Sequence, residues 1–173
     1  MAVSSYKTIS DIAATGAGII EGYASVFDVQ DEGNDIIRAG AYLQSIADCK
    51  ALVRKGQQTY LLPMLWQHDP NQPIGGWTSL EEDSYGLKCI GQILLSIPNG
   101  QQAYETLKAD VVRSFSIGYD VMPNGSYYEK GARNLTSLRL WEISVVTFPM
   151  CLEATVSSVK RNRHSSAIKV RLR

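Results

Sequence analysis

The sequence contains few of the residues that usually build metal sites and disulfide bonds. Only two histidines and three cysteines occur among its 173 residues. Cys49, Cys89 and Cys151 are odd in number and widely spaced, which fits neither a disulfide framework nor a zinc-binding pattern. The sequence therefore predicts a protein of a reducing compartment that uses no metal and no other cofactor.

Long apolar runs and an excess of charge of one sign are absent as well. No stretch approaches the roughly 18 continuous apolar residues of a membrane-spanning helix, and residues 1–15 lack the apolar run of a signal peptide. Lys and Arg together number 17, as do Asp and Glu, so the formal net charge is zero. We therefore expect a soluble, intracellular protein with neither a membrane nor nucleic acid as its partner.

The composition predicts one globular domain followed by a basic tail. Hydrophobic residues make up 45% of the chain and charged residues 20%, and 173 residues are enough to bury a core. The segment 160–173 carries six lysines and arginines and no acidic residue. We divide the chain into a domain of residues 1–155 and a tail of residues 156–173. The tail is either a solvated segment, or a site that attaches a partner or is removed by cleavage.

Strand patterns predominate along the domain. Runs of β-branched and aromatic residues predict strands over 16–27, 61–67, 74–80, 87–95, 113–122 and 135–148. Helical spacing predicts helices over 40–50 and 99–109, the second with Asn99 as its N-cap and Gln102 three residues later. The predicted fold is therefore mainly β with surrounding helices (α+β), in a barrel or a sandwich.

His68 is the candidate general base. It follows the apolar run 61–66 (LLPMLW) and precedes Asp69 and Pro70 where the predicted strand ends. A neutral imidazole is the usual general base near neutral pH, although a hydrogen-bonded structural histidine is the competing interpretation at such a position. The other histidine, His164, lies in the basic tail, where we expect it to be solvated.

Ser116 is the candidate nucleophile, and Ser114 is its rival. Strand alternation places Ser114, Ser116 and Gly118 on one face and three larger apolar side chains on the other. A face of small residues leaves room for a peptide to approach. Simple packing of a sheet explains the same pattern, so the local sequence alone does not select Ser116.

Glu142 is the candidate third member of such a site. Alternation along its strand places its carboxylate on the same face as Leu138, Leu140 and Val146. A carboxylate on an apolar face is unfavourable unless it is paired. Its partner is either an imidazole, which it would orient as in a nucleophile–base–orienter set, or an arginine such as Arg113 or Arg139.

Four segments of the chain resemble a known family. GYASVFDVQDEGNDIIRAGAY, LWQHDPNQPIGGW, RSFSIGYDV and LWEISVVTFPM occur in this order between residues 22 and 150. In this order they are similar to the prohead proteases of tailed bacteriophages, which are capsid maturation proteases related in fold to herpesvirus assemblin. Each motif is weak alone, and the four together at plausible spacing are a strong signal.

The resemblance implies a single-domain, assemblin-like β-barrel that often dimerises. The family's catalytic histidine falls on His68, its serine on Ser116 and its acidic third member on Glu142. The implied activity is that of a serine endopeptidase, which cleaves the scaffold, segments of the major capsid protein and itself. Its expected location is the interior of the procapsid, in the cytoplasm of the bacterial host.

Three other functions compete with this interpretation. The first is a catalytically inactive scaffold or assembly protein that keeps the same barrel. The second is a β-barrel that encloses a small ligand in an apolar pocket. The third, a cysteine protease using Cys89 or Cys151, is disfavoured because neither cysteine lies in a setting that lowers the pKa of its thiol.

Overall fold

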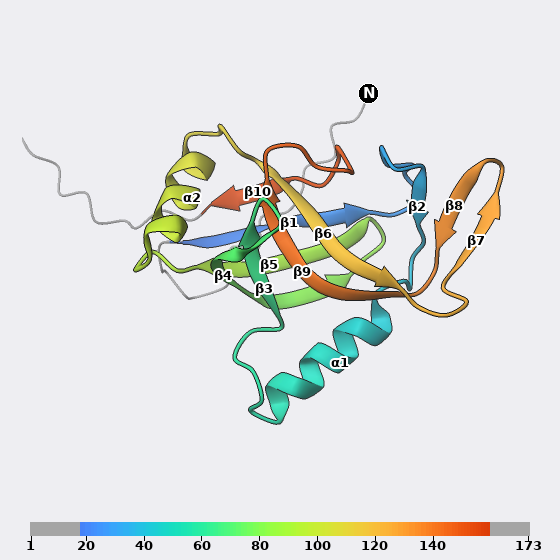
Figure 1. Cartoon of the computed structure of the whole chain (residues 1–173), viewed down its shortest axis with the longest axis horizontal. Helices are drawn as coiled ribbons and strands as arrows, with labels where there is room; N and C mark the ends of the chain where they lie inside the picture. Colours follow the sequence, from blue (N-terminus) through green and yellow to red (C-terminus); the bar gives the residue numbers. More distant parts are fainter. Residues whose placement is uncertain (1–17, 160–173) are drawn as a thin grey trace, which may run out of the picture.

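The computed structural model describes residues 18–159 (Figure 1). The strands are β1 (Ile19–Val26), β2 (Asp35–Ile37), β3 (Leu62–Trp66), β4 (Asp69–Glu82), β5 (Gly86–Ile93), β6 (Ser114–Val121), β7 (Ser126–Glu129), β8 (Ala132–Leu135), β9 (Leu138–Val146) and β10 (Val156–Val159), and the helices are α1 (Leu43–Arg54) and α2 (Pro98–Lys108). The structure confirms the prediction of a mainly β fold with surrounding helices.

Seven of the strands form one sheet, in the order β10-β1-β5-β4-β3-β9-β6. Neighbouring strands are antiparallel except for β3 and β9, which run parallel. The sheet curls so that its two edge strands, β10 and β6, approach each other. The Phe115 amide donates to the Ala154 carbonyl at 3.0 Å, and the Val156 amide donates to the Arg113 carbonyl at 2.8 Å. These bonds close one end of the barrel and hold the start of β6 in place.

A glycine permits this closure. A Cβ atom on Gly22 of β1 would lie 2.2 Å from the Thr155 carbonyl oxygen, so no larger residue fits where the chain returns towards β10. The Tyr23 amide donates to the same carbonyl at 3.1 Å. Gly22 is therefore the place where β1 meets the returning chain.

The interior of the curled sheet is filled with side chains. Trp77 and Phe115 are fully buried and meet edge to face, with their ring centroids 5.2 Å apart. The Trp77 indole N–H donates to the Ile143 carbonyl at 2.9 Å, so the one polar atom of this large side chain is satisfied. A packed interior of this kind disfavours the alternative of a barrel built around a small ligand.

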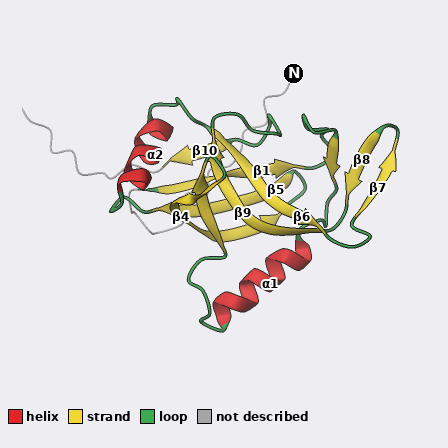
Figure 2. Ribbon diagram, in the orientation of Figure 1, coloured by secondary structure: helices red, strands yellow, loops and turns green. Residues whose placement is uncertain are grey.

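The two helices lie on the outside of the sheet (Figure 2). The segment that leads into α1 is held by Glu82 of β4, whose carboxylate accepts hydrogen bonds from the amides of Gly40 and of Tyr42, the N-cap, both at 2.7 Å. Within residues 18–159, neither helix is long and apolar enough to cross a membrane.

The predicted start of the second helix is wrong. Residue Ile97, not Asn99, is the N-cap of α2, and it makes no side-chain capping bond. Pro98 occupies the first helical position, where its fixed φ suits the helix and its missing N–H group needs no partner. The proline therefore starts the helix one residue before the asparagine that resembles a cap.

The sequence patterns did not predict two parts of the sheet structure. The stretch after β6 forms the hairpin β7–β8, which joins β2 in a three-stranded sheet of order β2-β8-β7. Strand β10 pairs with β1, so the folded region continues four residues past position 155. The domain boundary at 155/156 stays a prediction, and residues 160–173 of the basic tail and His164 lie outside the described residues.

Replacing Trp77 tests how much the packed interior contributes to stability. We expect Trp77→Ala to lower the free energy of unfolding by about 3–5 kcal/mol, because the change leaves a cavity in the core. Urea unfolding followed by circular dichroism measures the change. Trp141→Ala is the control, because Trp141 is 47% exposed, and the two variants should differ clearly. Equal losses would contradict the assignment of Trp77 to the core.

Candidate active site

Strand β6 presents its small residues on one face, as its alternation predicts. In the antiparallel register with β9, Ser116 lies opposite Ser144 and Gly118 lies opposite Glu142. Residues directly opposite each other on antiparallel strands share a face, with Cβ atoms about 5 Å apart. Phe115 points the other way, into the core. The serine face thus gathers Ser116, Gly118, Glu142 and Ser144 on two neighbouring strands.

A bulge in β9 places Glu142 on this face. Gly118 pairs with Glu142, whereas the next residue, Tyr119, pairs with Leu140, so Trp141 is an extra residue in the ladder. An extra residue reverses the alternation on either side of it. The expectation that Glu142 shares a face with Leu138 and Leu140 is therefore wrong: those two leucines belong to the core, and the carboxylate lies beside Ser116.

His68 reaches the serine face from the tight turn between β3 and β4. Trp66 pairs with Asp69, which leaves Gln67 and His68 as the two central residues of the turn, with φ of 56° and 59°. Positive φ at both positions is the signature of the type I′ turn that connects two-residue hairpins. The Gln67 amide donates to the Val145 carbonyl at 3.0 Å, which fastens the turn to β9.

His68 and Glu142 are paired. The Nδ1 atom of His68 lies 2.6 Å from Oε1 of Glu142. The histidine side chain is 41% exposed and the glutamate side chain is 11% exposed, so the pair joins a half-exposed ring to a buried carboxylate. Of the two ring nitrogens, the pairing occupies Nδ1 and leaves Nε2 for another partner.

The arginines considered as alternative partners of Glu142 are engaged elsewhere. Arg113 lies 3.9 Å from the carboxylate of Asp110, and the Arg139 guanidinium lies over the Trp141 ring at 4.0 Å from its centroid. The His68 imidazole, and not an arginine, is thus the group that pairs with the buried Glu142 carboxylate. The choice between an imidazole and an arginine, which the sequence left open, is decided by the fold.

Two other carboxylates, those of Asp69 and Asp120, lie near His68 or Ser116 in the sequence but do not orient His68. Asp69 accepts hydrogen bonds from the backbone amide of Asn71 at 2.8 Å and the side chain of Gln72 at 2.8 Å. These hydrogen bonds, the backbone one first, lower the pKa of Asp69 below its ordinary value. Asp120 is exposed and lies beyond the bulge. Glu142 is the carboxylate that contacts the ring.

Gly118 makes room for the carboxylate. A Cβ atom at this position would lie 2.5 Å from Oε1 of Glu142 and 3.0 Å from its Cγ, closer than side-chain atoms approach each other. From the sequence, Gly118 was expected only to leave room for a peptide substrate to approach. The structure gives it a steric one: the glycine clears the space in which Glu142 reaches His68.

Ser116 lies beside this pair and borders a cavity. Ser116 is 6% exposed and faces Ser144 across the strands. Within residues 18–159 no hydrogen bond joins Ser116 to His68. Such bonds are often long before a substrate binds. A cavity of about 80 Å³ lies against Ser116 and extends to Tyr119 and Met150, and neither His68 nor Glu142 lines it.

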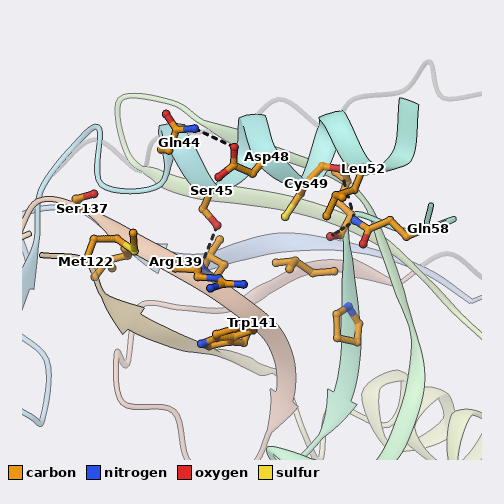
Figure 3. Close-up of a pocket in the computed structure, with 15 residues that line it drawn as sticks. Gln44, Ser45, Asp48, Cys49, Leu52, Gln58, Met122, Ser137, Arg139 and Trp141 are labelled. Atoms are coloured by element: carbon orange, nitrogen blue, oxygen red, sulfur yellow. Dashed lines mark hydrogen bonds between the residues drawn. The ribbon is translucent and has the colours of Figure 1, made fainter. Parts of the chain in front are cut away.

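A larger cavity lies elsewhere on the molecule. It has a volume of about 390 Å³ and opens between α1 and the start of β9, with Ser45 and Leu52 on one side and Arg139 and Trp141 on the other (Figure 3). Neither His68 nor Ser116 lines it. This groove is therefore separate from the candidate active site, although Trp141 precedes Glu142 in the chain.

The cysteines are poor candidates for a nucleophile. Burial raises the pKa of the Cys89 thiol well above its ordinary value, and burial is also the main cause of the raised pKa of Cys151. A raised pKa leaves less of the reactive thiolate. Across the described part of the chain, no group of three or more His, Cys, Asp or Glu side chains is placed to hold a metal ion.

Comparisons with known proteins agree with the motifs. A family model described as caudovirus prohead serine protease matches residues 4–168. The prohead protease of enterobacteria phage HK97 is 32% identical over 169 residues, which are 89% of this chain and 68% of that protein.

The chain is also similar to solved structures. The capsid assembly protease of bacteriophage T4 has a TM-score of 0.55 and 12% identity, over 76% of this chain and 82% of that chain. A protease of the herpesvirus KSHV has a TM-score of 0.46 and 14% identity, over 80% of this chain and 63% of that chain. The T4 likeness concerns the fold alone, and it confirms the fold that the four motifs imply.

Adding a methyl group at Gly118 tests the steric role of this residue. We expect Gly118→Ala to destabilise the protein by about 1–3 kcal/mol, because the new Cβ overlaps the Glu142 carboxylate. The double variant Gly118→Ala/Glu142→Ala removes the obstructing carboxylate. The free energy of unfolding that the double variant loses, measured by urea unfolding, should be smaller than the sum of the losses of the two single variants. Strict additivity would contradict the proposed contact.

Proposed function

The chain belongs to the caudovirus prohead serine protease family, and we propose that Ser116, His68 and Glu142 are its catalytic residues. The observation that carries the proposal is the pairing of His68 Nδ1 with Glu142 Oε1 at 2.6 Å beside the face that bears Ser116. Four motifs in family order agree with this assignment.

The proposed reaction is acyl transfer. The ionised Glu142 accepts a hydrogen bond from Nδ1–H, so the unprotonated Nε2 of His68 is the atom that takes the proton of the Ser116 hydroxyl. The Ser116 Oγ then attacks the carbonyl carbon of the scissile peptide bond. His68 returns the proton to the leaving amine, and a water molecule, activated by the same ring, hydrolyses the acyl-enzyme.

The substrates we propose are proteins of the assembling capsid. The HK97 relative is named a prohead protease and the T4 structure a capsid assembly protease. On this basis we propose that the enzyme cleaves scaffold segments, capsid protein segments and itself, inside the procapsid in the host cytoplasm. The homodimer that the resemblance implies stays a prediction.

Replacing each serine of β6 in turn separates the two candidate nucleophiles. We expect Ser116→Ala to lower the rate of scaffold cleavage by a factor on the order of 10⁶, as loss of a nucleophile does in other serine proteases. Ser114→Ala, the matched control on the same strand face, should retain most of the activity. Electrophoresis of scaffold protein incubated with each variant measures cleavage.

The outcome also decides between a protease and an inactive assembly protein. A wild-type chain that leaves scaffold and capsid protein uncleaved would favour the inactive alternative. A Ser116→Ala variant that still cleaves, together with an inactive Ser114→Ala variant, would move the nucleophile to Ser114.

Replacing the carboxylate by an amide tests the third residue. We expect Glu142→Gln to lower kcat by about 10⁴-fold, because an amide that presents its N–H₂ to Nδ1 favours the wrong tautomer of His68. Glu153→Gln is the control, since Glu153 is an exposed residue outside the site. Full activity in Glu142→Gln would reduce the catalytic set to a dyad of Ser116 and His68.

A further inference from the structure

We infer that Ser144 is a positioning residue that holds the base and its orienting carboxylate in register; this inference rests on the proposed function. Ser144 lies near the C-terminal end of β9, directly opposite Ser116, and its side chain is fully buried. It belongs to the motif around Glu142, yet its role cannot be read from the motif.

One hydroxyl group connects both members of the pair. The Ser144 Oγ donates a hydrogen bond to Oε2 of Glu142 at 2.6 Å and accepts one from the backbone N–H of His68 at 3.2 Å. A serine hydroxyl has one donor and two acceptor sites. Its single proton is engaged by the carboxylate, so the oxygen is free to accept from the turn.

The carboxylate depends on this bond for its orientation. Oε1 of Glu142 meets the imidazole, and Oε2 meets Ser144, so both oxygens of a buried group have a donor. An unmet oxygen would carry the penalty of a buried, unsatisfied acceptor. With Oε2 held by Ser144, rotation of the carboxylate away from His68 would break two hydrogen bonds at once.

The turn depends on it as well. Gln67 and His68 both have positive φ, a conformation that is unfavourable for residues other than glycine and persists where the surroundings enforce it. The Gln67 side chain is clamped to Thr147 by two bonds, at 2.8 and 3.1 Å. Among residues 18–159, Ser144 is the only residue whose side chain forms a hydrogen bond with the backbone of His68.

Ser144 is not a second nucleophile. Its proton points to a carboxylate and its side chain has no exposed surface, so no substrate carbonyl reaches it. It acts through His68 and Glu142, and the loss expected from its removal is a loss of geometry. A displacement of about 1 Å in a catalytic group lowers a rate by about 10²-fold.

The test uses a fluorophosphonate probe, which requires no knowledge of the cleavage specificity. The nucleophilic oxygen forms a bond to phosphorus and fluoride leaves, with the proton passing to the general base. Mass spectrometry of the intact chain gives the rate constant at saturating probe and the probe concentration for half-maximal rate. We expect Ser144→Ala to lower the rate constant by about 10²-fold, with little change in the half-maximal concentration.

Two further variants separate positioning from packing. Ser144→Cys nearly preserves the side-chain volume but donates a hydrogen bond only weakly, so its rate constant should also stay low. Ser45→Ala is the matched control: Ser45 is buried too, and its hydroxyl accepts from the Leu140 amide of the same strand at 2.9 Å. We expect Ser45→Ala to lose stability and to keep the wild-type rate constant.

A spectroscopic readout reports on the pair directly. The proton between His68 Nδ1 and Glu142 should give a resonance far downfield in the ¹H NMR spectrum, identified by its absence in His68→Gln. The resonance should persist in Ser45→Ala and shift or broaden in Ser144→Ala and Ser144→Cys. Thermal unfolding of each variant shows that the comparison is made on folded protein.

The outcomes distinguish this inference from the proposed function. If the wild type reacts at Ser116 and Ser144→Ala reacts equally fast with an unchanged resonance, Ser144 has no positioning role. A wild-type rate constant in Ser144→Cys would also overturn the inference, since packing would then suffice. If the probe does not label Ser116 in the wild type, the proposed function fails, and the resonance alone decides whether Ser144 holds the pair.

Discussion

The site is organised around a buried carboxylate that must be paired. Glu142 is 11% exposed at its side chain, and a charge in such a place is tolerated only when each oxygen meets a donor. His68 and Ser144 supply these donors from two different elements, a hairpin turn and the strand itself. The need to satisfy one carboxylate thus ties the turn between β3 and β4 to the centre of β9.

The sheet provides the positions that this pairing requires. Strand β3 runs parallel to β9, with Leu65 opposite Ser144. The turn that follows Trp66 therefore lies next to the serine face. On the other side, β6 runs antiparallel to β9 and places a serine and a glycine opposite Ser144 and Glu142. The bonds between β6 and the chain before β10 close the barrel at the start of β6, next to Ser116.

Irregular features of the backbone are concentrated at the site. The bulge at Trp141 turns Glu142 to the face of Ser116, and the positive φ of Gln67 and His68 turns the imidazole back over that face. The lack of a side chain at Gly118 leaves the space in which the two meet. Local departures from regular structure are commonly found where function constrains the chain. Here each of the three serves the same contact.

The amino-acid sequence alone predicted the class of fold, the boundaries of most strands and helices to within a few residues, and His68, Ser116 and Glu142 as the residues to consider. These depend on hydrophobic periodicity and on motifs, which are local properties of the chain. The starting point of α2, the hairpin β7–β8 and strand β10 were not predicted correctly, because a proline, a polar hairpin and a short strand give weak periodic signals. The partner of Glu142 and the place of Ser144 were decided by tertiary structure alone. A bulge changes which face a residue occupies, and only the packed sheet shows that the carboxylate meets an imidazole and not an arginine.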